Sequence, residues 1–208
     1  MSSKEFSNTS TGDAPADPYK AKNKDDPSLE EKIETLNNFV SYCKFGMMTT
    51  HNVSSNLLVS RCMAVAAKEG GGIDLLFHTN TESGKTDDLT DDPSINISFL
   101  NATGEWASIS GSSSILTDRE TVKKYYSPQL RAWVGDLGDG KHDGGPDDPR
   151  IGVIKVEAKT ITYAVTRGNV VSRGVEMVQG ALTGSTAQVN KLREISEDEC
   201  KQWRASHQ

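Results

Sequence analysis

Residues 45–80 read FGMMTTHNVSSNLLVSRCMAVAAKEGGGIDLLFHTN. Three runs of apolar and β-branched residues lie within this stretch, at positions 45–50, 57–67 and 73–79. Short polar breaks that contain asparagine or glycine separate the runs, at positions 51–56 and 68–72. Runs of this length between turn-forming breaks predict three β-strands joined by tight turns.

The same pattern continues further along the chain. Strand-like runs recur at positions 95–101, 105–116, 151–157 and 160–166. Two helices are expected between them: one starts near Ser83 and stops before Pro93, and the other starts at a capping box formed by Thr117 and Glu120. Several short strands at this spacing predict a mainly β fold, an antiparallel meander or barrel with peripheral helices.

The expected domain lies between two different terminal segments. Residues 1–27 contain no Val, Ile or Leu, so we expect a flexible N-terminal arm, or an arm that wraps a partner subunit. A capping box at Ser28 and Glu31 opens an amphipathic helix at the start of the domain, residues 28–185. Residues 186–208 form a C-terminal segment in which Ser196 and Glu199 predict the start of a short helix.

Composition limits the function classes. The chain has 208 residues and a formal net charge of −6, which disfavours nucleic-acid binding through a general positive field. The longest unbroken apolar run is Cys62 to Ala67, far shorter than the ~20 residues of a membrane-spanning helix. No signal peptide is visible and the three cysteines are scattered, so we expect a cytoplasmic protein without disulfides.

Residues 135–150 read GDLGDGKHDGGPDDPR and predict a long loop, which is expected to be functional or disordered. The aspartates of this loop do not have the spacing of an EF-hand, and no closing glutamate follows them. The four histidines are too far apart for a local ligand pair, so no metal site is expected. The usual nucleotide-loop and serine-nucleophile signatures are absent as well.

Two segments carry chemistry that suits an anion. In the first, alternation places Val59, Arg61 and Met63 on one face of the most apolar strand. A cation in such a strand needs either a carboxylate from elsewhere or an anionic ligand. In the second, Ser83 and Lys85 stand at the expected start of a helix, which is either a solvated helix cap or a phosphate site.

These segments, in this order, resemble the FMN-binding split-barrel superfamily, the pyridoxamine 5′-phosphate oxidase-like proteins. The resemblance runs from about Phe45 to Thr166 and is densest at Phe77-His78-Thr79-Asn80-x-x-Ser83-x-Lys85. Trp106, the stretch Arg131-Ala132-Trp133 and the loop before Ile151 resemble the general-stress-protein branch, which includes fungal blue-light-inducible proteins. The resemblance implies a six-stranded antiparallel split β-barrel.

The resemblance also implies a cofactor and its contacts. FMN would lie at the interface of a homodimer, with its phosphate held by Arg61, Ser83 and Lys85. The other residues implied at the cofactor are Cys62, Met63, His78, Thr79, Asn80, Trp106 and Trp133, the last from the other subunit. For the two tryptophans, plain core or dimer packing is the alternative.

Departures from the oxidases narrow the implied function. Gly84 stands where the oxidases commonly have an arginine, and Trp106 where they commonly have a glutamine. The C-terminal segment also lacks their Arg-Leu-x-Pro sequence, so oxidation of pyridoxamine phosphate itself is not expected. We expect an FMN-dependent oxidoreductase acting on a small or nicotinamide substrate. The alternatives are a flavin-binding stress or light-response protein without turnover, a binder of another flat ligand, and a barrel without a ligand.

Overall fold

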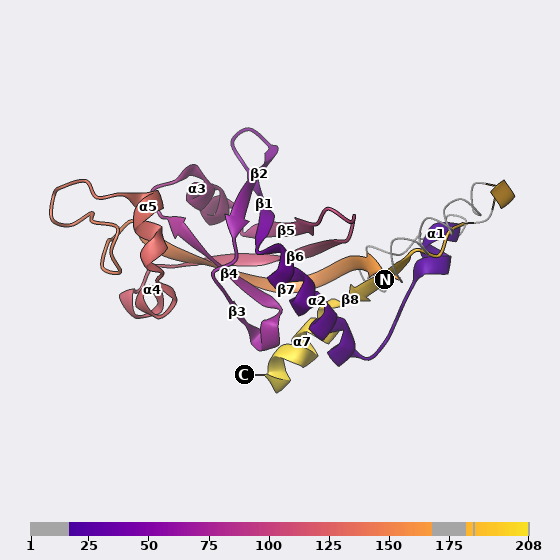
Figure 1. Cartoon of the computed structure of the whole chain (residues 1–208). Coiled ribbons are helices and arrows are strands. Elements are labelled where there is room, and N and C mark those ends of the chain that lie inside the picture. The colour runs from indigo at the N-terminus through magenta and orange to yellow at the C-terminus, as the bar shows by residue number, and fades with distance from the viewer. Residues whose placement is uncertain (1–16, 168–181, 185, 208) are drawn as a thin grey trace, which may run out of the picture.

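The computed structural model describes residues 17–167, 182–184 and 186–207, and its strands form one antiparallel sheet (Figure 1). Neighbouring strands pair in the order β2-β1-β5-β6-β7-β4-β3, and β8 pairs with β7 beside this path. The strands are β1 (Phe45–Asn52), β2 (Leu57–Ala64), β3 (Ala67–Glu69), β4 (Asp74–Asn80), β5 (Ser94–Leu100), β6 (Trp106–Leu116), β7 (Ile151–Thr166) and β8 (Asn190–Ile195).

The sheet is rolled. β2 and β3 lie at opposite ends of the strand order, yet only Val65 and Ala66 separate them in the chain. The Val65 amide donates to Lys44 O at the start of β1, and the Ala66 amide donates to Leu76 O in β4. Since two residues span only about 10 Å, the two ends of the sheet must meet at this point. The fold is the mainly β split barrel that the sequence predicts, with eight described strands rather than six.

The extra strands have physical causes. The run expected at 57–67 divides at Val65 into β2 and the short β3, because the chain passes there from one end of the sheet to the other. β8 was not predicted, since its hydrogen-bond partners lie on β7, far away in the sequence.

The two strands expected at 151–157 and 160–166 are one strand, β7. Lys159, which lies between the two runs, is the extra residue of a bulge against β6, where the pairing shifts between Ser110 and Gly111. Gly111 is required at this point, because a Cβ there would lie 2.0 Å from Glu157 O.

The barrel core follows the alternation along the strands. On β1, Gly46, Met48 and Thr50 face inward, whereas Phe45 and Met47 are exposed. Side chains from β4, β5, β6 and β7 complete the core, and α2 (Leu29–Cys43) packs on it through its apolar stripe, which comprises Ile33, Leu36, Phe39 and Val40.

The second half of the predicted arm is ordered. Residues 17–27 include α1 (Pro18–Asn23), and the fully buried Asn23 bonds to the main chain of Ala187 and Asn190. Asp25 pairs with the buried Arg193 of β8 at 2.7 Å, and Asp26 pairs with the buried Lys32 of α2 at 2.6 Å. The prediction of a flexible arm is therefore wrong for these residues, because two buried cations take carboxylates from them. Residues 1–16 lie outside the described part of the chain.

The remaining helices are α3 (Gly84–Asp91), α4 (Arg119–Tyr125), α5 (Arg131–Val134) and α7 (Glu197–Ser206), with short 3₁₀ turns at Gly70–Gly72 and Pro128–Leu130. The capping box of Ser196 and Glu199 is confirmed at α7. The N-cap of α4 is Asp118, which accepts from the Thr121 amide at 2.8 Å, rather than the predicted Thr117. α4 and α5 lie at one end of the sheet and α1 at the other (Figure 1). Within the described ranges, no helix is long and apolar enough to cross a membrane.

Candidate functional site

The turn between β4 and α3 forms one wall of a shallow hollow of about 350 Å³. The opposite wall comes from the end of β1 and from the middle of β2. The lining residues are Asn52, Val59, Arg61, Ser83, Gly84, Lys85 and Asp88. The two segments that the sequence singled out as anion-binding therefore face one space.

Arg61 is held in place by two neighbours. Its Nη1 donates to Thr50 Oγ1 at 3.0 Å, and its Nη2 lies 3.4 Å from Asp88 Oδ2. Its side chain keeps 27% of its surface exposed and lines the hollow. Of the two explanations left open for this arginine, the structure contains the ion pair, and it also leaves the guanidinium accessible to a ligand.

Asp88 is the carboxylate that the sequence analysis did not identify. It also accepts hydrogen bonds from Thr50 Oγ1 at 2.8 Å and from Asn52 Nδ2 at 2.7 Å. Burial raises the pKa of Asp88, but the hydrogen bonds from Asn52, Thr50 and Arg61 outweigh it and leave the pKa below its ordinary value. Asp88 therefore stays ionised and orients Arg61. Its position one helical turn after Gly84 was the available signal, because residues four apart share a helix face.

Lys85 supplies the second cation. Its Nζ donates to Ser83 Oγ at 2.8 Å, and no carboxylate lies within ion-pair distance of it among residues 17–167, 182–184 and 186–207. Burial and the nearby charge of Arg61 lower the pKa of Lys85. Both effects disfavour the ammonium ion, and an anion placed beside Lys85 and Arg61 would counteract them.

The start of α3 is open to a ligand. Ser83 is the N-cap residue, but its hydroxyl donates to Asn80 O at 2.7 Å and does not cap the helix. The Gly84 and Lys85 amides have no hydrogen-bond partner within the described residues. A Cβ added to Gly84 would meet no atom within 4 Å. Free amides and open space at a helix N-terminus, beside two cations, suit a phosphate group.

The β4 residues of the motif shape this turn. The Asn80 carbonyl accepts from Ser83 Oγ and from Thr86 Oγ1, and Asn80 Oδ1 accepts from the Glu82 amide. Thr79 is 5% exposed, and its hydroxyl also donates to Asn80 O. His78 Nε2 lies 2.7 Å from the carbonyl oxygen of Tyr125 at the end of α4. Each of these three residues thus makes at least one hydrogen bond within the protein through its side chain.

The other predicted site residues lie apart from the hollow within a single chain. Met63 is on the inner face of β2 and packs on the core, whereas Cys62 is exposed on the outer face. Trp106 lines a separate cavity of about 310 Å³ together with Tyr19 and Lys20 of α1. Trp133 is on α5 and is 87% exposed. The structure therefore brings Arg61, Ser83 and Lys85 together, but does not bring either tryptophan to them.

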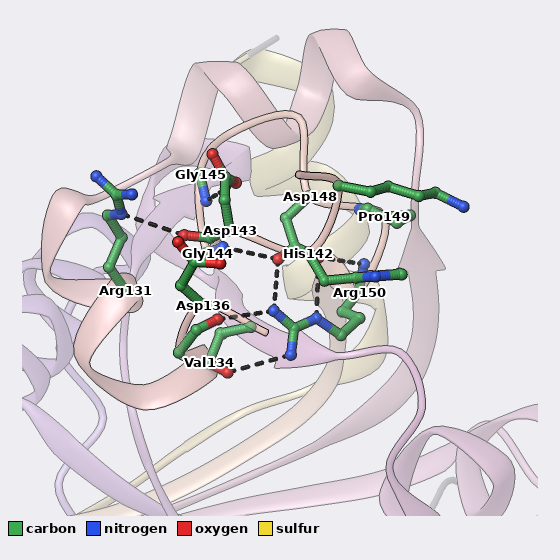
Figure 2. Close-up of polar contacts among 12 residues, drawn as sticks. Arg131, Val134, Asp136, His142, Asp143, Gly144, Gly145, Asp148, Pro149 and Arg150 are labelled. Atoms are coloured by element: carbon green, nitrogen blue, oxygen red, sulfur yellow. Dashed lines mark hydrogen bonds and ion pairs between the residues drawn. The ribbon is translucent and has the colours of Figure 1, made fainter. Parts of the chain in front are cut away.

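The loop at 135–150 is built around a buried ion pair (Figure 2). Arg150 Nη2 lies 2.7 Å from Asp148 Oδ2, and Arg150 Nε donates to Asp148 Oδ1 at 3.1 Å. Asp148 is fully buried and Arg150 is 6% exposed. The hydrogen bonds from Arg150 hold the pKa of Asp148 down at about 2, although burial opposes this.

Comparisons with known proteins agree with this fold. Residues 31–188 match the family described as pyridoxamine 5′-phosphate oxidase like. The chain is 59% identical to protein bli-3 of Neurospora crassa over 209 residues, which cover all of both proteins.

Solved structures resemble the chain at the level of the fold. A general stress protein 26 from a Jannaschia species has a TM-score of 0.57 at 16% identity, covering 81% of this chain and 99% of its own. A relative of general stress protein 26 from Clostridium acetobutylicum has a TM-score of 0.54 at 19% identity, covering 66% and 89%. A protein from Nostoc punctiforme described as pyridoxamine 5′-phosphate oxidase-related and FMN binding has a TM-score of 0.52 at 15% identity, covering 67% and 84%. With this rolled sheet and a match over most of its length, the chain belongs to the pyridoxamine 5′-phosphate oxidase-like family.

Proposed function

We propose that this protein binds FMN by its phosphate in the hollow at the start of α3 and uses it in an oxidoreductase reaction. The observation that carries the proposal is the convergence of Arg61, Lys85 and two unpartnered amides on one space. Only one carboxylate among the described residues, Asp88, lies in that lining, so the hollow carries an excess of positive charge. This excess of one positive charge, together with the positive end of α3, would offset most of the charge of a phosphomonoester, about −1.5 to −2.

The residues present fit this group. The fork of Arg61 is oriented by Thr50 and Asp88, and the ammonium of Lys85 is oriented by Ser83. Flavin chemistry would come from the FMN ring when it is bound, and the protein would supply binding and electrostatics. A volume of about 350 Å³ is at the lower end of ligand pockets, which supports a site that encloses the phosphate end while the ring lies outside.

We also propose a homodimer. Exposed apolar side chains lie on the outer face of β1, β2 and β5: Phe45, Met47 and Leu100 lie near one another, and Leu58 lies further along, opposite His51. The strand register supports this grouping, because Met47 is opposite Cys62 on β2 and Ser98 on β5, and all three share the outer face. A contiguous exposed apolar patch is typical of a protein interface. We propose a second copy of the chain as its partner, with Trp133 or Trp106 of one subunit approaching the flavin of the other.

The test compares FMN with riboflavin, which lacks the phosphate. Protein stripped of flavin is titrated with each compound while flavin fluorescence is recorded. FMN should bind at least about tenfold more tightly, since a single charge-assisted hydrogen bond contributes roughly 1.5–3 kcal/mol. Equal affinities, or no binding of either compound, would contradict the proposal. Anaerobic addition of NADH or NADPH then tests the oxidoreductase step, because turnover requires the bound flavin to lose its colour.

Flavin binding without turnover is the second candidate. It is favoured by the hydrogen bond between His78 Nε2 and Tyr125 O, which occupies the histidine of the Phe77–Lys85 motif that was the candidate general base. A flavin that binds tightly and stays oxidised with both nicotinamides would support this candidate.

A further inference from the structure

We propose that Asp148 and Arg150 are positioning residues for the phosphate-binding turn between β4 and α3. The proposal rests on the proposed function, because it assigns these residues an effect on FMN affinity. Neither residue lines the hollow. They would act through the main chain that they hold.

The ion pair is connected to the phosphate-binding turn through the main chain of Arg150. The Arg150 carbonyl accepts a hydrogen bond from the Thr81 amide at 2.7 Å, and Thr81 Oγ1 lies 3.2 Å from the same oxygen. The next strand residues continue the contact, since a Cβ on Gly152 would lie 2.8 Å from Thr81 Cγ2. Thr81 precedes Ser83 by two residues, so a shift of Arg150 moves the start of the turn that carries Ser83, Gly84 and Lys85.

The guanidinium of Arg150 is also connected to α5. Arg150 Nη2 donates to Gly135 O at 2.8 Å, and Nη1 donates to Val134 O at 3.2 Å (Figure 2). These carbonyls end the helix that bears the exposed Trp133. Arg150 therefore ties α5, through its guanidinium, and the phosphate-binding turn, through its carbonyl oxygen, to a common point.

Asp148 holds Arg150 and the loop together through several hydrogen bonds. Its carboxylate accepts from the Gly144 amide at 2.8 Å and from the Arg150 amide at 2.9 Å, in addition to the guanidinium. Its carbonyl accepts from Arg119 Nη1 at 2.7 Å. Every polar group of this buried pair that is described above has a partner, which is the condition under which a buried ion pair defines one geometry.

The shape of the Arg150 guanidinium is what makes an arginine necessary at this position. Its three nitrogens point to Asp148, Val134 and Gly135 at the same time, whereas a lysine ammonium at the end of a flexible chain cannot reach all three. Arg150→Lys thus keeps the positive charge but cannot make the three hydrogen bonds at the same time. Asp148→Asn is the matching change from the other side, because it keeps the size and removes the charge.

The experiment measures FMN and riboflavin affinities for the wild type, Arg150→Lys and Asp148→Asn, together with thermal unfolding. The matched control is Lys123→Ala, which removes an exposed ion pair with Asp147 of the same loop. We expect both variants to lose about 5-fold or more in FMN affinity relative to riboflavin, a typical size for coupling between sites. The control should keep the wild-type ratio. A lower melting temperature with an unchanged ratio of the two affinities would overturn the proposal, because the pair would then only stabilise the loop.

A second measurement separates this proposal from the proposed function. Hydrogen exchange of the amides at 81–86 is compared between the wild type and both variants without flavin. Faster exchange in the variants, at a temperature where they remain folded, supports the coupling even if the wild type binds no FMN. Unchanged exchange at 81–86 overturns the coupling even if FMN binds as proposed.

Discussion

Arg61 illustrates how one side chain combines two roles. It is oriented by Thr50 and Asp88, and it is still exposed to the hollow. Arg61→Ala should weaken FMN binding by about 10- to 150-fold, since it removes one charge-assisted contact of roughly 1.5–3 kcal/mol. Riboflavin affinity should change little in the same variant, as measured by fluorescence titration of both compounds. An equal loss for both, or a protein that no longer folds without ligand, would mean that Arg61 is structural only.

At Gly84, a substitution can add a contact to the phosphate instead of removing one. It stands where the oxidases that the sequence resembles commonly have an arginine, and a Cβ there meets open space. Gly84→Arg should raise FMN affinity about tenfold by adding one charge-assisted contact to the phosphate. Gly84→Ala is the control and should leave the affinity unchanged. If the arginine variant binds FMN no better than the alanine variant, the phosphate does not lie at the start of α3.

At the scale of elements, the loop at 135–150 should make the free energy of unfolding depend on pH in the acidic range. The pKa of Asp148 is about 2, below the ordinary value of 3.8, because Arg150 and the loop amides stabilise its charged form. A lowered pKa contributes stability that is complete above about pH 4 and is lost as the pH falls towards 2. The contribution is about 2 kcal/mol for a shift of this size.

Urea unfolding of the wild type and Asp148→Asn at several pH values tests this. The difference in unfolding free energy between the two proteins should be constant from pH 7 to about 4 and should shrink below that. Glu69, whose pKa is also lowered to about 2 by Lys155 and Tyr125, contributes equally to both proteins and cancels. A difference that does not change with pH would show that the Asp148 charge is not involved.

Another element-scale prediction concerns the attachment of residues 17–27. Arg193 is 2% exposed and pairs with Asp25 at 2.7 Å and with Glu31 at 2.7 Å. Asp25→Asn should lower the unfolding free energy by about 3 kcal/mol, because it leaves a buried cation less well compensated. Lys201→Ala, which removes an exposed pair with Glu197, should change it by less than about 0.5 kcal/mol. Equal effects of the two changes in urea unfolding would contradict this account of the segment.

At the scale of the whole molecule, the apolar outer face predicts an assembly. Wild-type protein should scatter light as a species of twice the 22.6 kDa chain mass. Met47→Asp should shift it to the mass of one chain, because a charge at the centre of this face would be buried without a partner. Leu137→Asp alters another exposed apolar residue, in the loop at 135–150, and should leave the mass unchanged. A wild-type protein of 22.6 kDa with FMN bound would rule out the homodimer.

Much of the fold could be predicted because its signals are local. The runs of apolar and β-branched residues at 45–50 and 105–116 appear in the structure as β1 and β6. β8 could not be predicted, since its pattern makes sense only beside β7. The break expected near residue 158 failed for a similar reason. A polar interruption in a strand can be a turn or a bulge, and only the partner strand decides which.

The sequence by itself determined most strands of the barrel, and it placed Arg61 within one of them and Ser83 and Lys85 in the turn and helix start that follow another. These depend on residues within one element, where side-chain period and capping act over a few positions. Only the tertiary structure decided that Asp88 orients Arg61, that Trp106 lies in a cavity with α1, and that Arg150 holds the turn before Ser83. The reason is that these contacts join residues distant in the chain. Which residues meet depends on strand register and on how the sheet rolls, and a shift of one residue would turn every side chain of a strand to the other face.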